Sequence, residues 1–158
     1  MLEKSIHTKL KEHTERLVGL FHDGKTEVVI NETSQLLQQY PDSLALYNIL
    51  GISNARLEKF EEAIKAYRIA IEIDPNSAIS YFNLGVSLQD TGKLEEALTN
   101  YKKAEKINPK YFGAIYNIAS IFKKMNIFPS AINYYKKALA LDTNYAPTYI
   151  NLALVHGS

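Results

Sequence analysis

The residues that could support catalysis or bind a metal are few and lie far apart in the sequence. The four histidines are His7, His13, His22 and His156, and none has the spacing that places two metal ligands on one helix face. There is no cysteine, which removes disulfides, thiolate metal sites and thiol catalysis together. The sequence contains neither a glycine-rich phosphate loop nor a nucleophile elbow. We therefore predict no enzymatic activity, no cofactor and no metal in this chain.

Length and charge exclude several classes of protein. The 158 residues, 46% of them hydrophobic, suffice to bury the core of one ordinary domain. The 18 basic and 17 acidic side chains leave a formal net charge of +1, without the concentrated positive surface that nucleic acid requires. No stretch approaches the ~18 consecutive apolar residues of a membrane span, and the first residues lack the apolar segment of a secretory signal. We predict a soluble, cytoplasmic protein that binds neither nucleic acid nor membrane.

The few residues that could bind a partner must be positioned by a scaffold. The sequence shows this scaffold as a repeat with a period of about 34 residues, the spacing between Gly51 and Gly85. Four columns keep one residue type: small residues at Gly51, Gly85 and Ala119, alanines at Ala63, Ala97 and Ala131, tyrosines at Tyr67, Tyr101 and Tyr135, and alanines at Ala70, Ala104 and Ala138. A fixed period of this length indicates a stacked helical array, in which each unit buries its apolar face against its neighbours. Such arrays usually bind other proteins.

Each repeat contains two predicted helices. Apolar residues recur at helical spacing on both sides of a break, and the breaks fall at Gly24, Glu58, Gly92 and Asn126. Three of these four residues accept the left-handed conformation that ends a helix, and Glu58 is the exception. Proline after Asp74 and after Asn108 stops two of the second helices. Pro129 falls in the first turn of its helix, where its missing N–H is not needed.

The period divides the chain, read as one domain over residues 1–158, into units with defined bounds. The predicted units are a degenerate N-terminal repeat at 10–43, three repeats at 44–77, 78–111 and 112–145, and an incomplete repeat at 146–158 with its first helix only. The first unit keeps Gly24 and Pro41 but not the alanines and tyrosine of the others. Terminal repeats are commonly atypical because one of their sides faces solvent.

The repeated residues follow a recognisable order of aromatic, Leu-Gly, aromatic, Ala, aromatic and Pro. The order is met by Tyr47, Leu50, Gly51, Ala63, Tyr67 and Pro75, by Tyr81, Leu84, Gly85, Ala97, Tyr101 and Pro109, and less fully by Ile115, Ile118, Ala119, Phe122, Ala131 and Tyr135. In this order, and in a period of about 34 residues, the units resemble tetratricopeptide repeats. The resemblance implies an all-α fold, a right-handed superhelical solenoid of antiparallel helix pairs.

The small and aromatic columns have a predicted structural role. We expect the Gly51 and Ala63 columns to lie where the two helices of a unit cross, so that a larger side chain there costs about 1–3 kcal/mol. We expect Tyr67, Tyr101 and Tyr135 to fill the space between units. Paired lysines at 102–103 and 136–137 are expected to lie on a solvated outer face.

The resemblance implies that the first helices line the concave side and that the residue two positions before the small column points into the groove. That residue is Ile49, Asn83, Asn117 or Asn151 in successive units. Three asparagine amides in successive repeats would form a ladder that holds the backbone of an extended peptide, similar to the asparagine ladder of O-GlcNAc transferase. Asparagine is also common in this column of the family, so the ladder can equally reflect the repeat consensus.

Hydrogen bonds alone do not account for a useful affinity. Three of them at a net ~1 kcal/mol each fall short of the roughly 8 kcal/mol of a micromolar complex. Apolar neighbours on the same helices must contribute. The further predicted partner-binding residues are therefore Ile52, Phe82, Val86 and Tyr116, with Asn48 and Lys123.

A second family mode, the carboxylate clamp for the acidic tails of cytosolic chaperones, is not predicted. It needs Lys and Arg on successive first helices, and the corresponding positions carry Asn48, Ile52, Asn83, Gly113 and Asn117 in one frame and Phe82, Val86, Asn117, Pro147 and Asn151 in the next. Arg56, Lys123 and Lys124 near the groove edge still favour an acidic partner, with Asp90 as a weak offset.

The last predicted helix, from Ala146, has almost no polar side. Apolar residues occupy most of its length, namely Tyr149, Ile150, Leu152, Leu154 and Val155. We expect this apolar surface to be exposed in an isolated monomer. Either the natural polypeptide continues beyond this helix, or the helix packs on a second copy in a homo-oligomer.

Two functions follow from the sequence. The first is a non-catalytic scaffold that binds a protein or an extended peptide in the concave groove. The alternative is an N-terminal recognition or oligomerisation arm of a longer protein whose catalytic part, a transferase or an oxygenase, is absent from this chain. The sequence names neither the partner nor the pathway.

Overall fold

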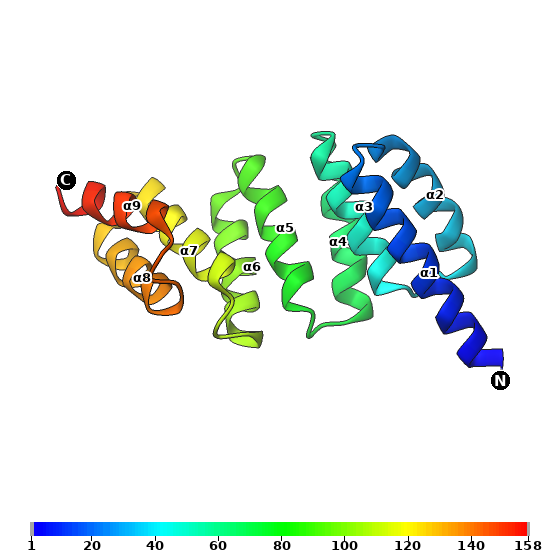
Figure 1. Ribbon diagram of the computed structural model, residues 1–158. Helices are drawn as coiled ribbons and strands as arrows, with labels where there is room; N and C mark the ends of the chain where they lie inside the picture. The colour runs from blue at the N-terminus through cyan, green and yellow to red at the C-terminus, as the bar shows by residue number, and fades with distance from the viewer. Residues whose placement is uncertain (1, 158) are drawn as a thin grey trace. The chain divides into compact units, whose positions relative to one another are not determined.

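The computed structural model describes residues 2–157, and over that range every regular element is an α-helix. The helices are α1 (Leu2–His22), α2 (Thr26–Gln39), α3 (Leu44–Arg56), α4 (Phe60–Ile73), α5 (Ala78–Asp90), α6 (Leu94–Ile107), α7 (Phe112–Lys124), α8 (Phe128–Leu141) and α9 (Ala146–His156). The predicted all-α fold of paired helices is confirmed (Figure 1). Within the described range, no helix is both long enough and apolar enough to span a membrane.

The helices group into two compact units, α1–α4 up to Pro75 and α5–α9 from Asn76 onward. In the first unit, α2 packs on α1 and α3, α3 packs on α4, and α1 also touches α3. The core of this unit includes Leu17, Val29, Leu36 and Leu46, all buried. Every helix of the first unit therefore has at least one neighbour against which to bury its apolar side.

The second unit repeats the same arrangement with one more helix. Helices α5 and α6 form a pair, α6 packs on α7, α7 pairs with α8, and α9 packs on both α8 and α7 (Figure 1). One buried cluster of this unit joins Ala119, Ala131, Tyr135 and Val155. In both units we call α1, α3, α5, α7 and α9 the first helices, and α2, α4, α6 and α8 the second helices.

The turns inside the pairs have one backbone conformation. Gly24 and Gly92 have φ of 77° and 78°, and the non-glycine residues Glu58 and Asn126 have φ of 58° and 59°. Glu58, the exception in the sequence pattern, adopts the left-handed conformation all the same. The repeat geometry thus overrides a local preference that costs a non-glycine residue about 1–2 kcal/mol.

Helices α3 and α5 begin at a serine cap. The Oγ atoms of Ser43 and Ser77 accept hydrogen bonds from the backbone N–H of Leu46 and Ser80, at 3.3 and 3.4 Å. Such a side chain satisfies one of the first four N–H groups of a helix, which have no partner inside it. The caps fix the residue at which each of these first helices begins, and so which of its residues face inward.

The glycine column is small because of the tyrosine column. A Cβ added at Gly51 would lie 2.6 Å from Cζ of Tyr67, and one added at Gly85 would lie 2.7 Å from Cε1 of Tyr101. These rings therefore lie on the glycine of their own helix pair. Tyr67, Tyr101 and Tyr135 are at most 2% exposed. The column is therefore small because a ring from the second helix of the pair occupies the space of the missing side chain, and the crossing of the two helix axes at this column stays a prediction.

Candidate functional site

The first helices of the first unit form an apolar pocket between α1 and α3. The cavity has a volume of about 200 Å³ and is lined by Val18, Phe21, His22, Ile49 and Ile52. Val18 and Ile52 are each 43% exposed, so two branched apolar side chains stand at its open side. We call this cavity the α1–α3 pocket. Its lining contains Ile52, one of the predicted partner-binding residues.

Arg56 holds the pocket wall in place. Its guanidinium carbon lies 3.5 Å from the centroid of the Phe21 ring, and its Nη1 donates a hydrogen bond to the Phe21 carbonyl oxygen. The same carbonyl, in the last turn of α1, also accepts from the backbone N–H of Gly24 at 3.1 Å, so the arginine adds a second hydrogen bond at the end of this helix. The predicted role of Arg56, attraction of an acidic partner, is thus accompanied by a structural one.

Asn48, also a predicted partner-binding residue, uses its amide on its own helix. Its Nδ2 donates to the carbonyl oxygen of Leu44 at 3.1 Å. The side chain is half-buried and does not line the α1–α3 pocket. The structure therefore gives Asn48 an internal contact and brings Ile52, not Asn48, to the cavity.

In the second unit, two of the three ladder asparagines bind tyrosine hydroxyls. Asn117 on α7 donates through Nδ2 to the hydroxyl of Tyr101 on α6, at 3.1 Å. Asn151 on α9 donates through Nδ2 to the hydroxyl of Tyr116 on α7, at 2.9 Å. Asn83 is half-buried, and its amide has no hydrogen bond to any other part of the described chain. The amides stand on the first helices as predicted, but two of them join neighbouring helices.

The hydroxyl of Tyr101 is a junction of three helices. It donates to Oε1 of Gln89 on α5 at 3.3 Å and accepts from Asn117 on α7. Burial raises the pKa of this tyrosine well above its usual range, the hydrogen bond from Asn117 lowers it, and the charge of Asp90 raises it. The neutral phenol is therefore the form present at physiological pH, and it both donates and accepts a hydrogen bond.

Aromatic rings pack beside these amides. Phe82 lies 5.7 Å from Tyr101 and 4.9 Å from Tyr111, ring centroid to ring centroid. Tyr116 lies 5.8 Å from Tyr135 and 5.3 Å from Tyr145. The predicted residues Phe82 and Tyr116 are thus half-buried members of aromatic clusters. Val86 is half-buried on the same helix as Phe82.

Lys123 on α7 is the charged member of the predicted site. Its Nζ donates to Oδ1 of Asn151 on α9 at 2.5 Å, so both polar atoms of the Asn151 amide are used. Lys123 is half-buried, whereas its neighbour Lys124 is exposed. The network Tyr116–Asn151–Lys123 joins α7 to α9 and contains no carboxylate.

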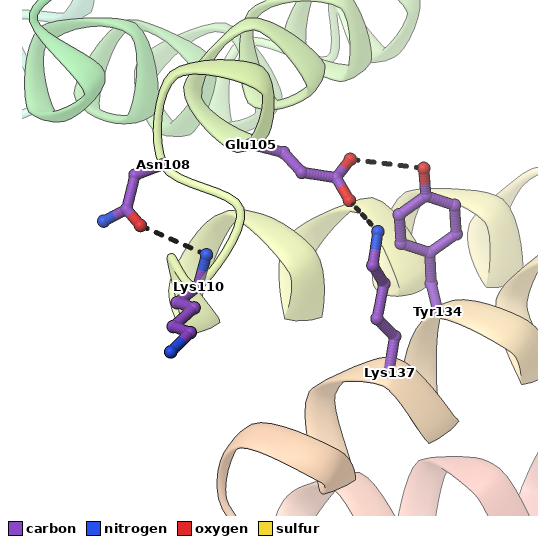
Figure 2. A network of polar contacts seen from close by, with 5 residues as sticks. All are labelled: Glu105, Asn108, Lys110, Tyr134 and Lys137. Atoms are coloured by element: carbon purple, nitrogen blue, oxygen red, sulfur yellow. Dashed lines mark hydrogen bonds and ion pairs between the residues drawn. The ribbon is translucent and has the colours of Figure 1, made fainter.

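The second helices of this unit carry their own polar contacts, drawn in Figure 2. Glu105 on α6 accepts from the hydroxyl of Tyr134 on α8 at 3.3 Å and pairs with the ammonium of Lys137, also on α8. The pKa of Lys137 is raised, first by its hydrogen bond to Glu105. In the turn after α6, Asn108 Oδ1 accepts from the backbone N–H of Lys110 at 3.1 Å. The lysines at 102–103 and 136–137 are exposed, as predicted. Lys137 also links α8 to α6 through its ion pair with Glu105.

Across the described residues, no group of three or more His, Cys, Asp or Glu side chains could hold a metal ion. What the first helices present is an apolar cavity, half-buried aromatics, amides and one partly buried lysine. The amides and the lysine are hydrogen-bonding groups, and the cavity and the rings offer apolar surface.

Comparison with known families agrees with the fold. The family model for the TPR repeat matches residues 53–92 and 88–126, and the model for the tetratricopeptide repeat matches residues 112–145. These matches together cover more than half of the chain. The chain belongs to the tetratricopeptide repeat family. Tetratricopeptide repeats are generally scaffolds for interactions between proteins.

Solved structures of tetratricopeptide repeat proteins resemble this one at low sequence identity. MamA has a TM-score of 0.83 at 19% identity, over 88% of this chain and 81% of its own. The protein pilF of Pseudomonas aeruginosa has a TM-score of 0.85 at 21% identity, over 92% and 66%. YrrB, a TPR protein with an unusual peptide-binding site, has a TM-score of 0.76 at 15% identity, over 89% and 73%. At these identities the likeness concerns the fold. No curated protein matches the sequence.

Helix α9 shows which part of the predicted apolar surface of this tetratricopeptide repeat chain is exposed. Tyr149, Ile150 and Leu154 are 51%, 61% and 58% exposed, as predicted. Val155 is only 4% exposed and packs in the cluster with Tyr135. The expectation for Val155 is wrong, because this residue turns toward α7 and α8 while Leu154 turns away.

The sequence missed most of the α1–α3 pocket. Val18, Phe21 and His22 lie at spacings of three and four residues and so share one face of α1. That spacing is visible in the sequence and could have indicated an inward-facing surface. It was obscured because α1 belongs to the degenerate first repeat, whose register is not fixed by the alanine and tyrosine columns.

Proposed function

We propose that this chain is a non-catalytic scaffold that binds a peptide segment of a partner protein on its first helices. The observation that carries the proposal is the α1–α3 pocket. It is almost wholly apolar, and its volume of about 200 Å³ is below the ~300–1,000 Å³ of small-molecule sites. A cavity of that size fits one large apolar side chain of a bound segment, which contributes roughly 1.5–3 kcal/mol on burial.

The amides of the second unit support the same function in a reduced form. Asn83 has no internal partner in the described chain, and Asn117 uses only its Nδ2. These two asparagines remain able to bind the backbone of an extended segment, beside the half-buried Phe82 and Val86. Asn151 and Tyr116 already bind each other, so we assign them a supporting role.

The test is selection of binders from a random peptide library displayed on phage, followed by affinity measurement with each selected peptide. Ile52→Asp places a carboxylate in the apolar pocket, and we expect at least about tenfold weaker binding. The matched control is Ile69→Asp on second helix α4. Ile69 is 37% exposed and lines a different cavity of about 340 Å³, formed by residues of α2, α3 and α4 that include Ile30 and Tyr47.

The two variants separate the two surfaces of the first unit. Binding that is lost in Ile52→Asp and kept in Ile69→Asp supports the proposal. Binding that is lost in Ile69→Asp and kept in Ile52→Asp places the partner at the cavity of Ile69, away from the α1–α3 pocket, and overturns the proposal. Circular dichroism of both variants checks that each remains helical.

No described feature favours the alternative function, an arm that serves a catalytic domain. The matched families are repeat families, and the similar structures are repeat proteins. A cytoplasmic location, the exclusion of nucleic acid and the lack of catalytic activity are part of the proposal and rest on the composition of the sequence.

A further inference from the structure

The hydroxyls of Tyr101 and Tyr135 occupy the same column of the repeat but have different surroundings. Tyr101 bonds to Gln89 and Asn117, so its buried hydroxyl is fully paired. One repeat further along the chain, those two partners correspond to Lys123 and Asn151. If the network repeated, Tyr135 would bond to both of them. It bonds to neither, because Asn151 donates to Tyr116 and accepts from Lys123.

Tyr135 is consequently left with an unsatisfied hydroxyl. The residue is fully buried, and its oxygen has no partner in hydrogen-bonding geometry among the described residues. Burial and, to a lesser extent, the charge of Tyr116 raise the pKa of Tyr135 to about 12, and a side-chain interaction with Ser120 that falls short of hydrogen-bonding geometry lowers it. A buried hydroxyl without a partner destabilises a fold, because nothing compensates the loss of its hydrogen bond to water.

One repeat further along the chain, the charge at the C-terminal end of the first helix is reversed. Helix α5 ends in Gln89 and Asp90, and helix α7 carries Lys123 and Lys124 at the corresponding positions. Among the described residues, no carboxylate lies within ion-pair distance of either lysine. Lys123 is half-buried and bound only to a neutral amide. A cation that is partly removed from water favours a carboxylate as its partner.

We propose that Lys123, at the junction of α7 and α9, binds a carboxylate of the partner segment. When the carboxylate pairs with the Lys123 ammonium, Oδ1 of Asn151 is released and accepts from the hydroxyl of Tyr135. One repeat earlier, an asparagine at the same position contacts the tyrosine at the same position: Asn117 binds the hydroxyl of Tyr101 at 3.1 Å. The exchange needs the same contact between Asn151 and Tyr135. Binding of the carboxylate to Lys123 thus gives the Tyr135 hydroxyl a hydrogen-bond partner. Lys123 lies outside the positions of the chaperone-tail clamp, so this is a different mode of carboxylate recognition.

The inference rests on the proposed function for the identity of the ligand, a protein segment, but its site can be tested without one. The probes are two small carboxylates, acetyl-aspartate α-amide for an acidic side chain and acetyl-glycine for a chain terminus. Each is titrated into the ¹⁵N-labelled chain at constant ionic strength, with sodium chloride as the reference. We expect saturable shifts of the backbone amides around Lys123 and of the side-chain amide of Asn151.

Four variants make the test specific. Lys123→Met keeps the aliphatic stem and removes the charge, and we expect at least about tenfold weaker binding. Lys136→Met removes one charge from an exposed lysine of second helix α8 and should bind as the wild type does, and Lys123→Arg should retain binding. In Tyr135→Phe, affinity should fall between those of the wild type and Lys123→Met, because the repair of the hydroxyl no longer contributes.

The probe that saturates at the lower concentration identifies the source of the carboxylate, and either result supports the site. Saturable binding that is lost in Lys123→Met supports it even if the Ile52→Asp peptide test fails. A wild-type response equal to that of chloride, or a response unchanged in Lys123→Met, overturns the inference.

Discussion

Single residues in this protein are constrained by partners on the next helix more than by their own helix. Gly51 is small because the ring of Tyr67 occupies the volume of its missing side chain. The sequence predicts that this column is small, since the repeat period exposes it directly. It cannot predict why, because the distance between the glycine of one helix and the ring of the next depends on how the helix pair closes.

Gly51→Ala should destabilise the protein by about 1–3 kcal/mol, because the new Cβ would lie 2.6 Å from Cζ of a ring that is buried and cannot move freely. The measurement is urea unfolding followed by circular dichroism. Gly19→Ala is the control: it lies inside α1 with no atom within 4 Å of an added Cβ, and should stabilise by about 0.5–1 kcal/mol.

The two changes are the same in chemistry and opposite in expected sign. If Gly51→Ala is as stable as the wild type while Gly19→Ala behaves as expected, the ring of Tyr67 accommodates the methyl group. That result would contradict the account of this column. The third pair has Ala119 in the column together with a buried Tyr135, so the test concerns the pairs built around glycine.

At the scale of helices, local signals predict where each element begins and ends. Left-handed residues close the turns inside the pairs, and proline follows two of the second helices, since both effects depend on the nearest few residues. The side of a helix that faces a neighbour is harder to predict. On α9, the adjacent residues Leu154 and Val155 are both apolar, and only packing against α7 and α8 separates the exposed one from the buried one.

Helix α9 gives a test at this scale. Val155→Glu places a charge in the cluster with Ala119, Ala131 and Tyr135 and should lower the thermal midpoint clearly, by the equivalent of about 3 kcal/mol or more. Leu154→Glu changes a residue that is 58% exposed and should leave the midpoint within a few degrees. Differential scanning calorimetry measures both. Equal thermal midpoints for the two variants would contradict the packing of α9.

Sedimentation of the same variants tests one of the two alternatives that the sequence leaves open for α9, contact with a second copy. We expect the wild type to associate as concentration rises and Leu154→Glu to remain monomeric, because Tyr149, Ile150 and Leu154 form the exposed apolar side. A wild type that stays monomeric at every concentration removes this prediction.

At the scale of the whole molecule, the chain consists of alternating first and second helices. The proposed function is defined by which of these two sets contacts the partner. The family and the all-α fold could be predicted from the sequence because they depend on a period repeated three times. The candidate site could be predicted only in part. The roles of Asn117 and Asn151 depend on which hydroxyl each amide meets, and the α1–α3 pocket is formed in part by a repeat that lacks the consensus residues.

The central claim, that the first helices bind the partner, is tested most directly by hydrogen–deuterium exchange with and without a peptide selected on the wild-type chain. With the peptide bound, we expect slower exchange of the backbone amides in the last turns of α1 and in α3, around Val18 and Ile52, with α2 and α4 unchanged. Slower exchange in α2 and α4, with α1 and α3 unchanged, would contradict it.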